Sequence, residues 1–450
     1  MLIVLSDVHL GDGTCGHSIS ADAFHIFADR LNSMALHASW RTDGSYRPIE
    51  QIDILLLGDI LDLLHSTLWL DTNLGTQDYT RPWTDRDAPA YAAKLSQITR
   101  AILKKNAESL DVLRNLTVTL PKATVTGQPS KKSPKGALVN IRLHYMIGNH
   151  DWFYGIPGEA FDAIRAEVVD AFGLAQSDAP FPYKPEDSAV LQETLAKYKV
   201  YALHGDCYDK FNYDEEKGRI NSALGDILTV EMFNRFHLEV ERRLTDIPPV
   251  MIENLRELTN VRPALATSLW VSSQITHNDL PNSLQNKIKA VWEQLGAEFL
   301  ALGVVRAFDK KMVFDSVDSL ELALQISRRT SFKTINDIAL WAQGKIWGGE
   351  VSYAEHALKE PAFLNKEAQY IVYGHTHHHE IVSLDTSESR TTQDDQVYFN
   401  SGTWHTYFDL AIHKPRTQKF IPYQVVSYLV FYHGDQRQGR RFETISGAYS

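Results

Sequence analysis

The chain has 450 residues and a formal net charge of −11, with 44% hydrophobic and 22% charged residues. This composition favours a large folded core over disorder, and the acidic balance argues against sequence-independent DNA binding. No apolar run approaches the ~18 residues of a membrane span, and the N-terminus lacks the basic region of a signal peptide. Two cysteines, Cys15 and Cys207, cannot form a disulfide framework. We therefore expect a soluble protein of the reducing cytoplasm.

Short apolar runs rich in β-branched residues recur along the chain, and each ends at a polar residue or a glycine. Runs of this kind, bounded by turn signals, predict buried strands. Helical stretches such as 22–33 and 88–116 separate them, which predicts a layered α/β fold. The predicted strands are residues 2–5, 52–57, 138–147, 200–203, 370–373 and 397–399.

The strand pattern stops after Cys207, and helical periodicity replaces it as far as about residue 366. Strands then resume at Tyr370, and the segment from Val425 to the C-terminus predicts a closing hairpin. We predict a discontinuous catalytic domain, residues 1–207 and 367–450, with a helical cap, residues 208–366, inserted between two strands. We expect this cap to be a lid that sets substrate choice; the alternative is a dimerisation or structural domain.

Polar clusters follow five of the predicted strands directly, where ligands of open α/β sheets bind. The clusters are Ser6-Asp7-Val8-His9, Gly58-Asp59-Ile60-Leu61-Asp62, Gly148-Asn149-His150-Asp151, His204-Gly205-Asp206 and Gly374-His375-Thr376-His377. Carboxylate, imidazole and amide donors suit Mn²⁺, Fe, Zn²⁺ or Ni²⁺, and they disfavour a Cys-type zinc site or an all-oxygen Ca²⁺ site. Seven candidate ligands suit two metals that share one carboxylate. Such a pair, ~3.5–4 Å apart, favours displacement at phosphorus.

The order of these five blocks resembles the calcineurin-like metallophosphoesterase superfamily, over roughly residues 1–207 and 367–420. The resemblance implies an α/β fold, a four-layer β-sandwich flanked by helices, here with a large helical insertion. It implies hydrolysis of phosphate mono- or diesters by a metal-bridging hydroxide, with two divalent ions, Mn²⁺ first. The implied ligands are Asp7, His9, Asp59 and His377 for one metal, and Asp59, Asn149, His204 and His375 for the other. His150 would lie near the leaving group, oriented by Asp62.

Other polar residues near these blocks are not expected to bind metal or to take part in catalysis. We expect Asp151 to be structural, and only His375 and His377 of the histidine run to be ligands, because alternate residues of an extended segment share a side. A second His-Gly-Asp, residues 433–435, falls out of the superfamily's order and is expected to touch no metal. The turn at residues 400–404 is expected to shape the site without doing chemistry.

Two subgroups of the superfamily are partly similar to the chain. UDP-diacylglucosamine hydrolases also carry a helical cap at this place, but they usually have Gly-Asn-Arg-Asp where this chain has His150, and their insertion is much shorter. Double-strand-break repair nucleases share Asp-x-His-Leu-Gly and Gly-Asn-His-Asp, so a DNA or RNA nuclease is the alternative function, against which the acidic charge stands. A metal-free protein-binding scaffold should show gaps in the ligand set, and none is visible.

We expect a phosphorylated small-molecule or nucleotide-type substrate and no nucleic-acid partner. The sequence leaves open the native metal, the preference for mono- or diesters, peripheral membrane contact and the oligomeric state. Basic residues of the cap are candidates for gripping a phosphate, although solvated helix ends are the favoured interpretation. These residues are Arg242, Arg243, Arg306, Lys310, Lys311, Arg328 and Arg329.

Overall fold

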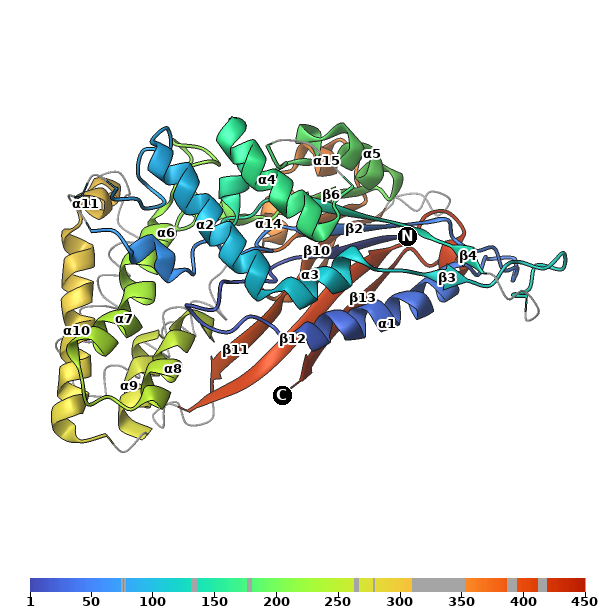
Figure 1. Ribbon diagram of the computed structural model, residues 1–450. Helices are drawn as coiled ribbons and strands as arrows, with labels where there is room; N and C mark the ends of the chain where they lie inside the picture. Colours follow the sequence, from blue (N-terminus) through green and yellow to red (C-terminus); the bar gives the residue numbers. More distant parts are fainter. Residues whose placement is uncertain are drawn as a thin grey trace.

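The computed structural model describes residues 1–73, 76, 78–130, 136–175, 180–262, 267–277, 280–309, 353–386, 395–411 and 419–449. It has a mixed α/β fold built on two main sheets (Figure 1), which confirms the expected α/β class. In the part of the chain so described, no helix combines the length and the apolar character that crossing a bilayer requires.

The larger sheet begins with parallel strands from the N-terminal third of the chain. Its order is β5-β2-β1-β12-β11-β7, and β13 pairs with β12. The strands are β1 (Leu2–Leu5), β2 (Gln51–Leu57), β5 (Asn140–Met146), β7 (Val261–Arg262), β11 (Trp404–Leu410), β12 (Phe420–Phe431) and β13 (Phe442–Tyr449). β1, β2 and β5 are parallel, with Leu2 opposite Asp53 and Ile54 opposite Leu143. β12 and β13 form the predicted closing hairpin.

The smaller sheet contains the two strands that precede and follow the long helical segment of the chain. Its order is β6-β8-β10-β9, with β6 (Val200–Ala202), β8 (Tyr370–Tyr373), β9 (His379–Asp385) and β10 (Gln396–Ser401). β6 and β8 are parallel neighbours, with Val200 opposite Tyr370. A separate two-stranded ribbon joins β3 (Thr119–Leu120) and β4 (Ala137–Leu138). The predicted strand at 138–147 is therefore divided between β4 and β5.

Apolar side chains of both sheets meet in one core. Leu2 and Leu55 of the larger sheet share this core with Val372 and Phe399 of the smaller one, all completely buried. Burial on both faces explains why these strands are continuous apolar runs and do not alternate with polar residues.

Helices cover the outer faces of the sheets (Figure 1). α1 (Ala21–Ala38), α2 (Pro89–Lys105), α3 (Ala107–Arg114) and α4 (Glu159–Phe172) pack on the larger sheet, while α14 (Ala354–Ala357) and α15 (Pro361–Leu364) pack on the smaller one. The predicted helix at 88–116 is interrupted at Asn106, which separates α2 from α3. Side chains of α5 (Ala189–Lys197) enter the core between the sheets. Short 3₁₀ turns are η1 (Thr67–Leu70), η2 (Trp152–Gly155), η3 (Pro185–Asp187), η4 (Asp206–Tyr208) and η9 (Gln436–Gly439).

Helices from Leu224 to Asp309, here called the helical block, gather at one end of the sheets (Figure 1). They are α6 (Leu224–Leu228), the π-helical turn η5 (Thr229–Asn234), α7 (Arg235–Arg243), α8 (Pro249–Arg256), the 3₁₀ turn η6 (Glu257–Asn260), α9 (Thr267–His277), α10 (Asn282–Ala301) and α11 (Gly303–Asp309). Their apolar faces form a core of their own, in which Leu224, Phe236 and Ile288 are completely buried.

The helical block is attached to the sheets by buried contacts. Trp270 packs against Phe408 and Phe420, with ring centroids 4.6 and 5.0 Å apart. The sheet body is here the described part of the chain outside the helical block. Its buried Arg81 pairs with Glu231 of the block at 2.7 Å. The block is thus held against the sheet body by aromatic packing and a buried ion pair.

Candidate metal centre

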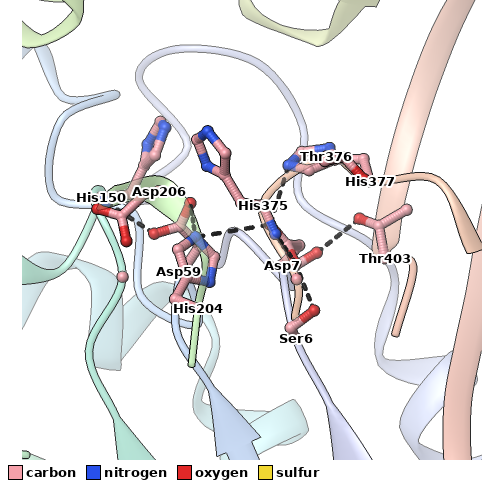
Figure 2. Close-up of polar contacts among 12 residues, drawn as sticks. Ser6, Asp7, Asp59, His150, His204, Asp206, His375, Thr376, His377 and Thr403 are labelled. Carbon is pink, nitrogen blue, oxygen red and sulfur yellow. Dashed lines mark hydrogen bonds and ion pairs between the residues drawn. The ribbon is translucent and has the colours of Figure 1, made fainter. Parts of the chain in front are cut away.

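The five polar clusters lie together at the ends of β1, β2, β5, β6 and β8, and Figure 2 shows members of all five side by side. Backbone hydrogen bonds connect them. The amides of Val8 and His9 donate to the carbonyl of Asp59, and the amide of Gly374 donates to the carbonyl of His204. The two sheets therefore bring their carboxyl ends to one place.

Asp7, His9 and His377 form the first group of ligand-type side chains. Nε2 of His377 lies 3.1 Å from Oδ1 of Asp7 and 3.1 Å from Nε2 of His9. The other ring nitrogen of each histidine is occupied: Nδ1 of His9 donates to Asp62 at 2.9 Å, and Nδ1 of His377 is 2.9 Å from the Tyr407 hydroxyl. Two imidazoles thus present Nε2 to the same point, as in metal sites whose ligands are oriented from outside.

Asp59, His204 and His375 form the second group. Nε2 of His204 is 3.1 Å from Oδ2 of Asp59 and 3.9 Å from Oδ1 of Asp7, while its Nδ1 donates to the Leu57 carbonyl at 3.0 Å. Oδ2 of Asp59 is also 3.8 Å from Nε2 of His9. Asp59 therefore faces both groups, the position expected of a bridging carboxylate.

Electrostatics at this point favour positive charge. Burial lowers the pKa of the His204 imidazole, but the carboxylates of Asp59 and Asp7 raise it to about 9.

The remaining candidate ligand is Asn149, which precedes His150 in the chain. The amide of His150 donates to Oδ1 of Asp59 at 2.7 Å. Within the described residues, the buried Oδ1 of Asn149 has no hydrogen-bond partner. An unpaired buried oxygen costs free energy, and a bound cation is one partner that would satisfy it.

The backbone at the candidate ligands is strained. Asp7, His9, Asp59, His375 and His377 all have φ between 49° and 66°, the left-handed region that non-glycine residues rarely adopt. Such a conformation costs on the order of 1–3 kcal/mol per residue and clusters at functional sites. Strain at five candidate ligands is an indication of function that does not depend on the motif.

Two glycines let the backbone approach the carboxylates. A Cβ added to Gly148 would lie 2.3 Å from Oδ1 of Asp59, and one added to Gly374 would lie 2.6 Å from Oδ2 of Asp7. Both distances are far below van der Waals contact. The glycines of the Gly-Asn-His-Asp and Gly-His-x-His blocks are therefore required by packing against the candidate ligands.

His150 lies beside the two groups and contacts Asp62. Its Nδ1 donates to Oδ1 of Asp62 at 2.9 Å. Burial lowers the pKa of His150, but the carboxylates of Asp62 and Asp59 raise it to about 9, which favours the protonated imidazole. Burial opposes the ionisation of Asp62, yet His150 and His65 hold the pKa of this carboxyl well below its usual range. His150 and Asp62 are therefore in direct contact.

Several residues of the site were not predicted from the sequence. His65 donates Nδ1 to Asp62 at 2.6 Å, and its spacing three residues after Asp62 could have indicated it. Asp209 accepts from Nε2 of His375 at 3.1 Å. The guanidinium of Arg219 pairs with Asp206 and donates to the Gly148 carbonyl at 2.7 Å, so it joins two of the polar clusters.

The structure also gives the contacts of the other polar residues that the sequence analysis considered. Asp151 accepts from the Ile60 amide at 2.9 Å and the Tyr145 hydroxyl at 2.7 Å, a structural role. Asp435 of the second His-Gly-Asp pairs with Arg47 at 2.7 Å. In the 400–404 turn, the Thr403 hydroxyl donates to the Asp7 carbonyl at 2.7 Å.

Two of the basic cap residues are neutralised within the helical block. Arg242 and Arg243 both pair with Glu239, at 2.6 and 2.7 Å, which supports their interpretation as solvated helix ends. Arg306 is exposed on α11. Lys310, Lys311, Arg328 and Arg329 lie outside the described residues. The thiols of Cys15 and Cys207 are free.

Comparisons of the chain with protein-family models, with curated proteins and with solved structures found no match. The functional assignment therefore depends on the geometry of the site and on the order of its motifs.

Proposed function

We propose that the chain is a two-metal phosphoesterase of the calcineurin-like metallophosphoesterase type, which hydrolyses phosphate mono- or diesters. The observation that carries this proposal is the pair of adjacent ligand groups, Asp7–His9–His377 and Asp59–His204–His375, with Asp59 facing both. The core shared by the two sheets, with helices outside, supports the four-layer arrangement of that superfamily.

The donors present fit two divalent ions. Asp7, His9, Asp59 and His377 would hold one, and Asp59, Asn149, His204 and His375 the other. Mixed oxygen and imidazole nitrogen donors without thiolate suit Mn²⁺ best, with Fe, Zn²⁺ or Ni²⁺ as alternatives. The unpaired Oδ1 of Asn149 and the carboxylates beside His204 support this fit. Two such ions supply an activated water at neutral pH and neutralise charge that develops on the phosphoryl oxygens.

The chain's own residues orient the donors and hold a proton. Asp62, Tyr407 and the Leu57 carbonyl each occupy one nitrogen of a candidate ligand histidine, which fixes the tautomer and directs the other nitrogen inward. The His150 imidazolium is held by Asp62 through Nδ1, so Nε2 carries the remaining proton. We assign His150 as the group that donates this proton to the leaving oxygen.

The test is metal reconstitution followed by hydrolysis assays. Protein freed of metal and reloaded with Mn²⁺ should contain two ions per chain by elemental analysis. It should hydrolyse p-nitrophenyl phosphate or bis-p-nitrophenyl phosphate, and the ratio of the two rates decides between monoester and diester preference. Metal-loaded protein that hydrolyses neither these esters nor cyclic nucleotides, nucleotide-sugar pyrophosphates or single-stranded DNA would contradict the proposal.

A further inference from the structure

Asp62 is a shared anchor for three imidazoles. Its Oδ1 accepts from Nδ1 of His150, and its Oδ2 accepts from Nδ1 of His9 and of His65, at distances between 2.6 and 2.9 Å. Asp62 is only 1% exposed, so the surrounding protein determines where its carboxylate lies. A displacement of Asp62 would turn a candidate metal ligand and the candidate proton donor together.

The turn that presents His65 to Asp62 is held from the helical block. Asn234, the last residue of η5, donates from Nδ2 to the Leu64 carbonyl at 2.7 Å and to the Ser66 carbonyl at 3.3 Å. These two carbonyls lie on either side of His65. His65 then donates both its amide, at 3.0 Å, and its Nδ1 to Asp62. Direct contacts therefore lead from Asn234 through the His65 turn to Asp62.

The surroundings of Asn234 indicate a contact that is kept despite its cost. The side chain is completely buried, and its Oδ1 lacks a hydrogen-bond partner among the residues the structure describes, which is unfavourable in a protein interior. η5 is π-helical, a rare conformation that is frequent at functional sites. The same turn cannot move away easily, because Glu231 pairs with the buried Arg81 and Val230 lies in the core of the sheet body.

We propose that Asn234 is a positioning residue for His65, Asp62 and His150. Through Asn234, the helical block then fixes the side of the site that donates the proton. The catalytic consequence rests on the proposed function, whereas the positioning itself is a property of the metal-free chain and is testable there.

The test variant is Asn234→Leu, which keeps the side-chain size and removes the donor. Asn260→Leu is the matched control: Asn260 also belongs to the block, is 3% exposed, and donates from Nδ2 to a carbonyl of the sheet body, that of His17, at 3.1 Å. Asn234→Ser, which keeps a small polar group, replaces the leucine variant if that variant does not fold.

The first readout is the exchange of the imidazole protons in ¹⁵N-histidine-labelled, metal-free protein, assigned with His65→Gln and His150→Gln. Nδ1–H of His65 and His150 should exchange slowly in the wild type and in Asn260→Leu. In the Asn234 variants we expect exchange faster by about tenfold or more, because the turn opens locally. Equal protection in the Asn234 and Asn260 variants would overturn the proposal.

The second readout is the leaving-group dependence of hydrolysis with Mn²⁺. In Asn234→Leu, kcat for a phenyl ester should fall roughly 10–100-fold with KM nearly unchanged, and the loss should shrink for the p-nitrophenyl ester. Asn260→Leu should match the wild type. Losses equal for both leaving groups would overturn the positioning role. A wild type that hydrolyses nothing refutes the proposed function, while the exchange measurement still decides where Asn234 acts.

Discussion

The strand-end loops and the helical block hold their polar side chains in different ways. In the loops, Asp7 and Asp59 are almost completely buried, have positive φ and face other ionisable groups. In the block, Arg242 and Arg243 lie on a regular helix and pair with Glu239 of the same helix. The candidate site thus lies where the backbone is strained and charge is crowded, whereas the block contributes contacts that hold this arrangement.

The largest expected effect comes from Asp59, which faces both ligand groups. In Asp59→Asn, the shared carboxylate charge is lost, so occupancy of both metals should fall. The loss of activity should exceed the roughly 10–100-fold typical of removing an outer hydrogen-bond partner. Elemental analysis and kcat/KM measure the two effects. An active variant that keeps two metals would show that the Asp59 carboxylate is not a ligand shared by the two metals. The strand-end loops would then not differ from the block in the way described above.

The next effect concerns proton donation by His150. His150→Ala should lower kcat by roughly 10²–10⁴ at nearly unchanged metal content, with a smaller loss on p-nitrophenyl esters, whose leaving group needs little protonation. His433→Ala, at an exposed position in the second His-Gly-Asp, is the control and should be fully active. Full activity of His150→Ala on poor leaving groups would exclude the assigned role.

A smaller effect is expected where the chain entering the block touches the site. Asp209 accepts from Nε2 of His375 at 3.1 Å, so Asp209→Asn should weaken Mn²⁺ binding by roughly 10–100-fold. Asp214→Asn is the control: it removes the charge that pairs with Lys217 at 3.1 Å but keeps an acceptor oxygen for the amides of Glu216 and Lys217. Titration calorimetry with Mn²⁺ compares the two variants. Equal affinities would show that the block's entry segment does not support the ligands.

The smallest effect is on the stability of the block. Burial and Arg256 lower the pKa of His237 to about 4, against about 6.5 in an unfolded chain. Acid therefore protonates the unfolded state first, and stability falls as pH decreases from about 6.5 towards 4, by about 2 kcal/mol between pH 7 and pH 5.

Thermal unfolding at both pH values, followed by calorimetry, checks this stability change. His237→Gln should flatten the pH dependence of the transition that belongs to the block. His25→Gln, at an exposed position of α1, should leave it unchanged. A transition whose pH dependence survives in His237→Gln would assign the effect to another group.

Much of the sheet architecture could be predicted, because the strands are buried on both faces and so appear as apolar runs. The runs at 2–5 and 370–373 match β1 and β8 residue for residue. The division of 138–147 into β4 and β5 was not predicted, since the apolar pattern continues across Val139. The break between α2 and α3 at Asn106 was also not predicted, because the helical periodicity of the sequence does not change there.

The site was predicted only as far as its residues lie in the motifs. His204 and Asp59 follow strands directly, and the structure brings them together. Asp209 lies just after the His204-Gly205-Asp206 cluster but 166 residues from its partner His375, and Asn234 lies 170 residues from Leu64. How the chain packs sets these partners, and no local pattern encodes it. His65 is the intermediate case, because its spacing three residues after Asp62 is a local signal that the sequence does contain.

An anomalous difference map from crystals grown with Mn²⁺ tests the proposed two-metal site directly. We expect two manganese peaks ~3.5–4 Å apart on either side of the Asp59 carboxylate. One should lie beside Asp7, His9 and His377, and the other beside Asn149, His204 and His375. A single peak, or manganese bound elsewhere while these side chains bind no metal, would contradict the proposed site.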